Sequence, residues 1–205
     1  MDGHPHVGER VQDERRGEGG DADQRFSGAE RGQRPLDPRR EAAGDQVAEA
    51  VNFNAPGQVV IAGHAEALRR AIEAAKARGA KRALPLPISV PCHSSLMQPA
   101  AERLRERLRS CTLAAPSIRF LSSVDATEYR DPEVIRDLLY RQLASPVRWV
   151  STIEALVALG VTQFIECGPG KVLAGLTRRI DKRPELHIAA LETVDNISAI
   201  KEALK

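Results

Sequence analysis

A single histidine, His93, stands where the sequence pattern changes from strand to helix. It follows a short apolar run broken by prolines, residues 84–91, and precedes residues 94–97, which begin a helical pattern. A turn between two rigid elements fixes a side chain while its tip stays accessible, and an imidazole changes its charge near neutral pH. His93 is therefore a candidate general base. The alternative is a surface or helix-capping histidine, which an isolated histidine more commonly is.

Cys92 lies beside His93 and raises the alternative of a thiol nucleophile. Adjacent residues of an extended segment point to opposite faces, so the two side chains do not pair easily. Cys167 ends an apolar run and is typical of a small core residue. With Cys111 these are the three cysteines of the chain, widely spaced and without a CxxC pair. This pattern argues against a disulfide framework or a zinc site and favours a reducing, cytoplasmic compartment.

The run Gly168-Pro169-Gly170-Lys171 superficially resembles a phosphate-binding loop. Such a loop needs GxxxxGK[ST], whereas here one residue separates the glycines and Val172 follows the lysine. A strand-to-helix turn is the better interpretation. Arg148 could meet a carboxylate or a phosphate, but a structural salt bridge near Trp149 is the preferred interpretation.

The bulk properties of the chain exclude several classes of function. The chain has 205 residues and a net charge of +2, so nothing favours nucleic acid or an anionic membrane surface as a partner. It contains no run of about eighteen apolar residues and no apolar core of a signal peptide. Neither a membrane span nor export is therefore expected.

Residues 1–45 differ in composition from the rest of the chain. They hold eight of the fifteen glycines and no lysine, isoleucine or tyrosine, and their apolar residues follow neither a helical nor a strand period. Such a segment cannot bury enough apolar surface to offset the cost of ordering it, so it is predicted to be disordered. Two origins are open for residues 1–40: a natural tail, or out-of-frame translation of a GC-rich gene.

From residue 46 onward the sequence predicts a hairpin, a helix and a further strand. Val47–Phe53 and Gln58–Ile61 are short strand-like runs separated by a turn that contains Pro followed by Gly. Residues 65–78 carry apolar side chains at helical spacing, and Gly79 is a typical helix C-cap. Arg82–Ile88 is the next expected strand.

Beyond His93, helical and strand patterns alternate. Strands that alternate with helices predict a parallel sheet with helices packed on it. Helices are expected around residues 96–108, 132–142, 149–159, 171–180 and 197–204, and strands around 118–121, 161–166 (as a buried strand) and 187–190.

Four motifs stand out in the chain: residues 51–63 (VNFNAPGQVVIAG), Val90-Pro91-Cys92-His93, residues 142–149 (QLASPVRW) and residues 166–173 (ECGPGKVL). Together they resemble one family, the malonyl-CoA:acyl carrier protein transacylases of bacterial fatty-acid synthesis. The resemblance runs from about Glu41 to the end of the chain and covers the C-terminal part of the family's domain. Its abrupt start favours the out-of-frame origin for residues 1–40 as a hypothesis.

The resemblance implies an α/β fold. Residues 91–205 would be the C-terminal part of the parallel-sheet, α/β-hydrolase-like acyltransferase domain. Residues 46–90 would be an incomplete ferredoxin-like subdomain that lacks its first strand and first helix, so its sheet would be weakly stable. Residues 1–45 would be the disordered tail.

The resemblance also assigns roles to particular residues. His93 would be the base that activates a serine, and the backbone carbonyl of Gln142 would hold its ring. Cys92 stands where the family motif has serine, a small change beside the base. Asn52 and Asn54 would line the substrate cleft, although asparagines that flank a turn need no function. The implied partners are malonyl-CoA and acyl carrier protein, and no metal or redox cofactor is implied.

The nucleophile of the family is absent from this sequence. It is the serine of a GxSxG elbow, and no GxSxG occurs in the 205 residues. The arginine that binds the malonyl carboxylate and the donors of the oxyanion hole belong to the missing part as well, so the fragment is expected to be inactive alone. The alternative function is a non-catalytic remnant that binds acyl carrier protein through Arg69, Arg70, Lys81 and Arg82.

Overall fold

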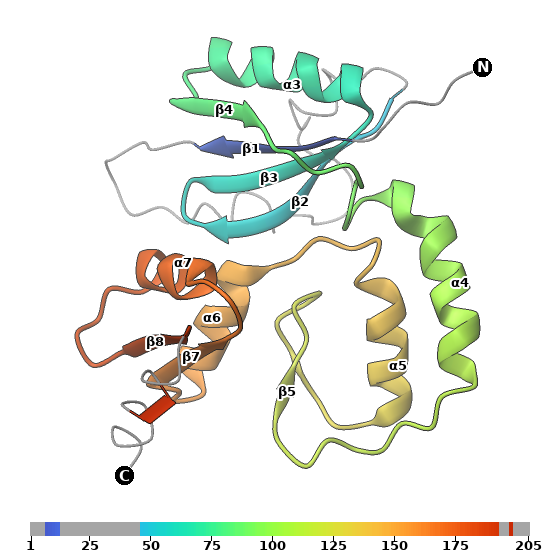
Figure 1. Cartoon of the computed structure of the whole chain (residues 1–205), viewed down its shortest axis with the longest axis vertical. Coiled ribbons are helices and arrows are strands. Elements are labelled where there is room, and N and C mark those ends of the chain that lie inside the picture. Colours follow the sequence, from blue (N-terminus) through green and yellow to red (C-terminus); the bar gives the residue numbers. More distant parts are fainter. Residues whose placement is uncertain (1–6, 13–45, 193–196, 199–205) are drawn as a thin grey trace, which may run out of the picture.

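The computed structural model of the chain describes residues 7–12, 46–192 and 197–198. Figure 1 shows an upper sheet with one helix on it and, below it, two groups of helices and short strands. The helix expected over residues 197–204 lies outside the described residues, apart from residues 197 and 198, which are helical. In the described part of the chain, no helix is long and apolar enough to cross a membrane.

Four antiparallel strands form the upper sheet. They are β1 (Val7–Gln12), β2 (Ala48–Ala55), β3 (Gln58–Gly63) and β4 (Arg82–Pro85), in the order β2-β3-β1-β4. The expected hairpin of β2 and β3 is confirmed. Gly57 closes its turn with a φ of 71°, a conformation that suits glycine because it has no Cβ.

The strand β1 corrects two expectations. Residues 1–45 were expected to be disordered and the sheet to lack a strand, but Val7–Gln12 pairs with β3 on one side and with β4 on the other. The backbone N–H and C=O groups of any residue other than proline can pair with a neighbouring strand. A segment whose side chains show no strand pattern can therefore become a strand when both of its edges are paired. The segment between β1 and β2 lies outside the described residues, so the ferredoxin-like topology stays a prediction.

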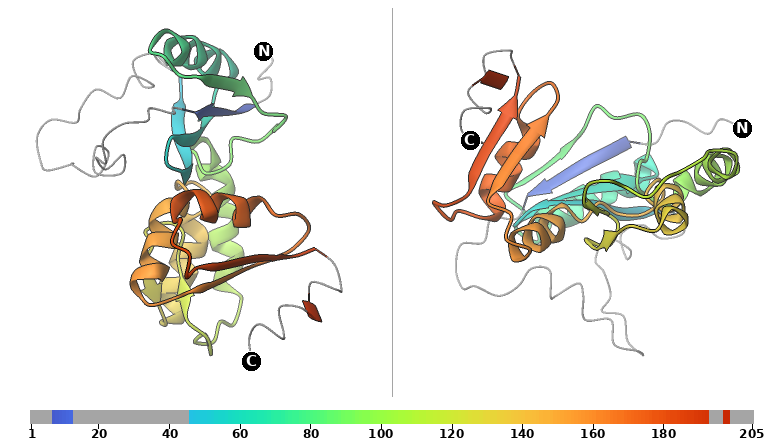
Figure 2. Two further views of the ribbon diagram at one scale, coloured as in Figure 1. Left: turned by 90° about the vertical axis from the view of Figure 1, so that its left-hand side faces the viewer. Right: turned by 90° about the horizontal axis from the view of Figure 1, so that it is seen from below.

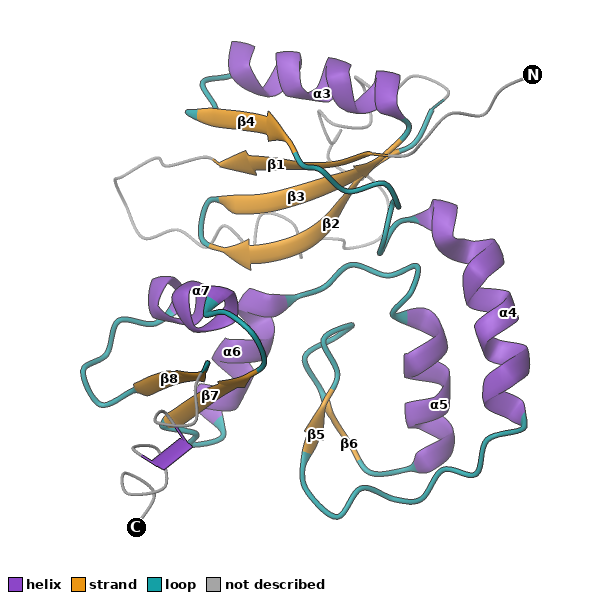
Figure 3. Ribbon diagram, in the orientation of Figure 1, coloured by secondary structure: helices purple, strands orange, loops and turns teal. Residues whose placement is uncertain are grey.

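Helix α3 (Ala65–Ala77) packs on one face of this sheet (Figure 3). Its buried residues Ala67, Leu68 and Ala71 contact Ile61 of β3 and Ala48 of β2 in one apolar cluster. Leu68 and Ile61 are almost completely buried, and each such side chain contributes about 1.5–3 kcal/mol to folding. The helical period predicted for residues 65–78 is therefore confirmed, and it marks the buried face correctly.

A helical hairpin carries the residues next to His93. It consists of the 3-10 turn η1 (Ser95–Met97), α4 (Gln98–Arg109) and α5 (Pro132–Arg141). Between α4 and α5 lies a small ribbon of β5 (Phe120–Leu121) and β6 (Glu128–Tyr129). The strand expected at 118–121 is shorter than predicted. Ile118 lies outside the ribbon and is 80% exposed.

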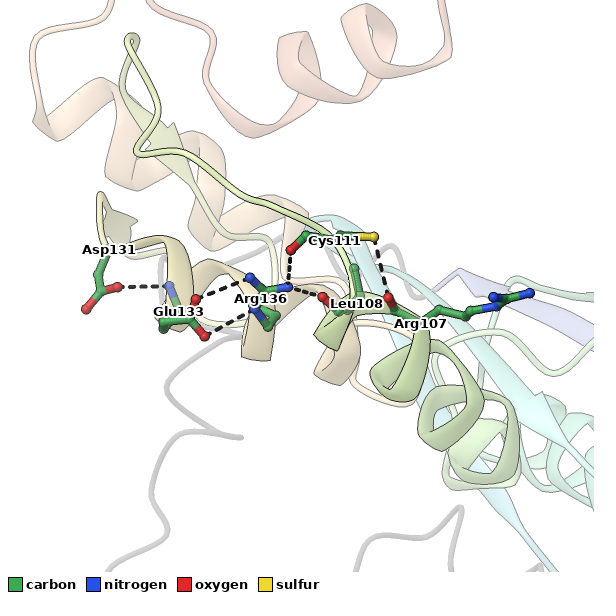
Figure 4. Close-up of polar contacts among 6 residues, drawn as sticks. All are labelled: Arg107, Leu108, Cys111, Asp131, Glu133 and Arg136. Carbon is green, nitrogen blue, oxygen red and sulfur yellow. Dashed lines mark hydrogen bonds and ion pairs between the residues drawn. The ribbon is translucent and has the colours of Figure 1, made fainter.

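Arg136 of α5 ties the two helices together at one end (Figure 4). Its guanidinium donates to the carbonyl oxygens of Leu108 and, at 2.9 Å, Cys111, where α4 ends, and it pairs with Glu133 of its own helix. The last carbonyls of a helix have no partner within the helix, so a cation at this point both bonds them and meets the negative end of the helix dipole.

The last described elements are α6 (Trp149–Ala158), β7 (Gln163–Cys167), α7 (Val172–Ile180) and β8 (His187–Leu191). Strands β7 and β8 pair in parallel, and they are the only parallel pair of named strands in the described ranges. The buried strand expected at 161–166 is only half-buried, and its end residues Gln163 and Cys167 are exposed.

The upper sheet rests on α6 and α7 through β2 (Figure 2, left). At this junction the guanidinium of Arg179 in α7 donates to the side-chain oxygen of Gln58, a buried residue at the β2–β3 turn. Beside it, Val147 pairs with the outer edge of β2: its N–H donates to the carbonyl of Val51 and its own carbonyl accepts from the N–H of Phe53, each at 2.9 Å. The segment that precedes α6 is thereby attached to the sheet.

Candidate active site

Two consecutive carbonyls at the end of α5 hold His93. The ring Nδ1 of His93 lies 2.7 Å from the carbonyl oxygen of Gln142, and its backbone N–H donates to the carbonyl oxygen of Leu143 at 3.0 Å. The backbone of His93 has a φ of 66°, in the left-handed region that few residues other than glycine adopt. Residues kept in such conformations cluster at functional sites, where the surroundings hold them in place.

The contact with Gln142 determines which ring nitrogen carries the proton. A carbonyl oxygen only accepts hydrogen bonds, so Nδ1 must be the protonated nitrogen of the neutral ring. Nε2 then carries the lone pair and has no hydrogen-bond partner among the described residues. A half-buried imidazole with one tethered nitrogen and one available nitrogen is the arrangement of a general base.

The turn around His93 is fixed from the opposite side by β2. The carboxylate of Glu49 accepts from the backbone N–H of Ser95 at 2.7 Å and from its hydroxyl at 2.9 Å. Ser94, fully buried, closes the turn by donating its hydroxyl to the carbonyl of Pro91 at 2.7 Å. The sequence analysis did not identify Glu49, and no local signal could have done so, because 46 residues separate it from Ser95.

The start of α4 is bonded to α5 close to this turn. Gln98 donates to the Tyr140 hydroxyl at 2.7 Å and to Glu102 at 2.8 Å, and Tyr140 donates to Glu102 at 2.7 Å. The hydrogen bonds from Tyr140 and Gln98 lower the pKa of the Glu102 carboxyl. Together with Arg136 at the far end, these contacts set α4 against α5, and so His93 against Gln142.

The predicted substrate residues Asn52 and Asn54 lie half-buried on β2. Asn52 forms an isolated parallel bridge with Val147, in the same motif that supplies Gln142. The structure thus brings the first and third motifs side by side. Within the described residues, however, no hydrogen bond joins either asparagine to His93.

The alternatives raised for other residues find little support. Cys92 and Cys167 are exposed free thiols, so Cys167 is not the core residue that the sequence suggested. Arg148 is exposed and, within the described residues, forms no ion pair. At the glycine turn before α7, the carboxylate of Glu166 accepts from the N–H of Ala174 at 2.8 Å and so occupies the helix start where a phosphate would bind.

This chain is similar to known acyl transferase domains. The model of the family described as the acyl transferase domain matches residues 25–191, and the chain belongs to that family. The match begins at residue 25, earlier than the start expected near Glu41.

The relatives are malonyl CoA-acyl carrier protein transacylases. The protein of that name from Salmonella typhimurium is 54% identical over 140 residues, which are 68% of this chain and 45% of that protein. An acyl carrier protein S-malonyltransferase from Vibrio cholerae matches with a TM-score of 0.82 and 40% identity, over 98% of this chain and 60% of that one. A malonyl-transacylase solved with its type II PKS acyl-carrier protein matches with a TM-score of 0.80 and 38% identity, again over 98% of this chain and 60% of that one.

The chain spans less than half of the Salmonella protein and about three fifths of the two solved chains. Its likeness is to the C-terminal part of these transacylases.

Proposed function

We propose that this chain supplies the base of an acyltransferase that moves malonyl from coenzyme A to acyl carrier protein in fatty-acid synthesis. The observation that carries the proposal is the 2.7 Å contact between His93 Nδ1 and the Gln142 carbonyl, which leaves Nε2 as the basic nitrogen. The two substrates, malonyl-CoA and acyl carrier protein, are inferred from the names of the relatives. The solved complex of a malonyl-transacylase with its acyl-carrier protein supports the carrier as a partner.

In this mechanism a serine of the family's GxSxG elbow is the nucleophile, and this sequence does not contain that motif. The serine oxygen attacks the malonyl thioester while its proton passes to Nε2 of His93. The imidazolium then gives that proton to the departing thiolate of coenzyme A. The carrier's thiol reverses the sequence: it loses its proton to Nε2, attacks the malonyl-serine ester, and the serine oxygen recovers the proton.

The end of α5 has a second role in this proposal. The helix dipole has its negative end here, and the carbonyls of the two residues that follow α5, Gln142 and Leu143, face the ring and the backbone N–H of His93. They stabilise the positive ring that forms each time Nε2 takes a proton. Gln142 is therefore a positioning residue that acts through its backbone, and Asn52 and Asn54 are proposed to contact the substrate.

We further propose that residues 46–90, with β1 added, and residues 91–205 are the two structural parts of the chain. The second part belongs to an α/β-hydrolase-like domain. The cytoplasm is the proposed compartment, which agrees with three free thiols. Without the serine, the malonyl-binding arginine and the oxyanion hole, the chain alone is expected to transfer no malonyl.

A chimeric enzyme tests the function directly. The matched C-terminal part of the Salmonella typhimurium transacylase is replaced, in one continuous polypeptide, by residues 46–205 of this chain. We expect the chimera to transfer malonyl to acyl carrier protein, and His93→Ala to lower the rate by about 10²–10⁴-fold. Cys92→Ser, which restores the family motif, is the matched control and should leave the rate within about threefold. A folded chimera that transfers no malonyl, or one whose rate is unchanged by His93→Ala, would contradict the proposal.

A binding module without catalysis remains the second candidate. Arg69, Arg70, Lys81 and Arg82 are all exposed, as a carrier-binding surface requires. Arg69 is paired with Glu66 at 2.8 Å, which reduces its charge toward a partner. Titration of the chain with acyl carrier protein tests this second candidate. Binding that is lost in Arg82→Glu but kept in Arg103→Glu, a control at an exposed site on α4, would favour the binding module.

A further inference from the structure

One strand, β2, is bonded to both segments that form the His93 site. The carboxylate of Glu49 accepts from the backbone N–H of Ser95 at 2.7 Å and from its hydroxyl at 2.9 Å, two residues after His93. Further along, the backbone of β2 pairs with Val147, in the motif that supplies the carbonyl of Gln142. The turn that carries the imidazole and the segment that carries its acceptor are therefore both held by the same strand.

The turn at His93 needs such support. Its φ of 66° lies in the left-handed region, and a residue with a Cβ stays there only where its surroundings hold it. Within the helical hairpin this support comes from the carbonyls of Gln142 and Leu143, and both act on His93 itself. Glu49 adds a contact from outside the hairpin, 46 residues away in sequence. A movement of the turn relative to β2 would shift the ring relative to the carbonyl that orients it.

Glu49 acts as a helix cap supplied by another element. Ser94 is the N-cap residue of η1 but makes no side-chain cap bond, and its hydroxyl donates to the carbonyl of Pro91. The first N–H groups of a helical segment have no partner within it, and the N–H of Ser95 is one of them. The carboxylate of Glu49 accepts this N–H, and charge-assisted hydrogen bonds of this kind are shorter and stronger than neutral ones. The start of η1 is thereby fixed to β2.

We propose that Glu49 is a positioning residue for the acyl transfer. It acts through Ser95: by fixing the start of η1 to β2, it keeps the imidazole of His93 in the orientation in which Nδ1 faces the carbonyl of Gln142 and Nε2 is available. Within the described residues Glu49 forms no hydrogen bond with His93, so its influence passes through the backbone of the turn. This role rests on the proposed function, whereas the orientation of the ring can be measured in the chain without any turnover.

The first experiment determines the tautomer of His93 in the complete 205-residue chain from the ring ¹⁵N shifts, at a pH where the ring is neutral. We expect the Nδ1–H form in the unsubstituted chain and a shift of both resonances toward the Nε2–H form in Glu49→Ala. Glu49→Gln should restore the Nδ1–H form, because its amide oxygen still accepts the N–H of Ser95. The matched control is Glu106→Ala, at an exposed position on α4, and its ring shifts should equal those of the unsubstituted chain.

Amide exchange separates positioning from a general loss of structure. The N–H groups of Phe53 and Val147 pair β2 with the segment before α6, and their protection should stay within about threefold in Glu49→Ala. If Glu49→Ala does not fold, Ser95→Ala takes its place. It removes only the hydroxyl contact, at an exposed position, and should move the ring shifts in the same direction by a smaller amount. Ring shifts that stay unchanged in a folded Glu49→Ala, or in Ser95→Ala where Glu49→Ala does not fold, would overturn the proposal.

The second experiment measures the catalytic consequence in the chimeric transacylase. Glu49→Ala should lower kcat about ten- to a hundredfold and leave KM within about threefold, because a misplaced base slows the chemical step more than it weakens binding. Glu49→Gln should recover most of kcat, and Glu106→Ala should leave it unchanged. A higher KM at unchanged kcat would overturn the positioning role. If the chimera with Glu49 in place transfers no malonyl, the proposed function fails, and the tautomer in the complete chain still decides whether Glu49 orients the ring.

Discussion

His93 and Gln142 are 49 residues apart in sequence, yet His93 Nδ1 lies 2.7 Å from the Gln142 carbonyl oxygen. The acceptor is a backbone atom at the end of α5, and the next carbonyl, that of Leu143, accepts from the backbone of the same histidine. The orientation of the ring thus depends on where α5 ends, and not on the side chain at position 142.

Gln142→Ala should therefore leave the imidazole undisturbed. The substitution keeps the carbonyl and exchanges one good helix former for another, so unfolding free energy should change by less than about 0.5 kcal/mol. The ring ¹⁵N shifts of His93 report its tautomer, and the neutral ring should carry its proton on Nδ1 in both proteins. A proton on Nε2, or a tautomer that changes in Gln142→Ala, would contradict the assignment of Nε2 as the basic nitrogen.

Arg136→Ala should destabilise the helical hairpin. Its guanidinium is mostly shielded from solvent, pairs with Glu133 and satisfies the carbonyls of Leu108 and Cys111 (Figure 4). Losing charge-assisted hydrogen bonds of this kind costs about 1.5–3 kcal/mol, measured by urea unfolding. Arg136→Lys should recover part of the loss, since one ammonium cannot reproduce the planar fork. Arg103→Ala, an exposed arginine on α4, is the control and should cost less than about 0.5 kcal/mol.

Glu102 should titrate below the ordinary range of a glutamate, because the hydrogen bonds from Tyr140 and Gln98 lower the pKa of its carboxyl. A carboxyl whose pKa is lower in the folded than in the unfolded state stabilises folding above its unfolded pKa. That contribution is lost as the pH falls through the folded value. NMR titration of the Glu102 side chain measures the midpoint, and Tyr140→Phe should move it upward. An unchanged midpoint in Tyr140→Phe would show that the hydrogen bond is absent in solution.

Gly63→Ala should be severely destabilising. A Cβ at this position would lie 2.0 Å from the carbonyl oxygen of Val47, where β2 and β3 approach closely. Overpacking against backbone costs about 3 kcal/mol or prevents folding. Gly175→Ala offers the matched comparison: a Cβ there meets nothing within 4 Å, and alanine should stabilise α7 by about 0.5–1 kcal/mol. Thermal unfolding should show a lower melting temperature for Gly63→Ala and a higher one for Gly175→Ala. A small change in Gly63→Ala would contradict the close approach of Gly63 to the backbone of Val47.

Local patterns predicted the elements whose causes are local. The Pro-Gly turn between β2 and β3, the apolar face of α3 and the Asp131 cap of α5, whose carboxylate accepts from Glu133 at 2.8 Å, all follow from neighbouring residues. The sequence by itself also identified His93, and through the resemblance it paired His93 with the Gln142 carbonyl. The contact is present, while the catalytic role of these residues stays a proposal.

Only the tertiary structure decided the features that depend on distant partners. β1 is a strand because β3 and β4 pair with both of its edges, a condition that its composition did not reveal. Glu49 anchors the His93 turn from another element, and β7 is open on one edge because no described strand pairs with it. Hydrogen bonds between segments far apart in the chain leave no periodic trace in either segment, so local pattern cannot predict them.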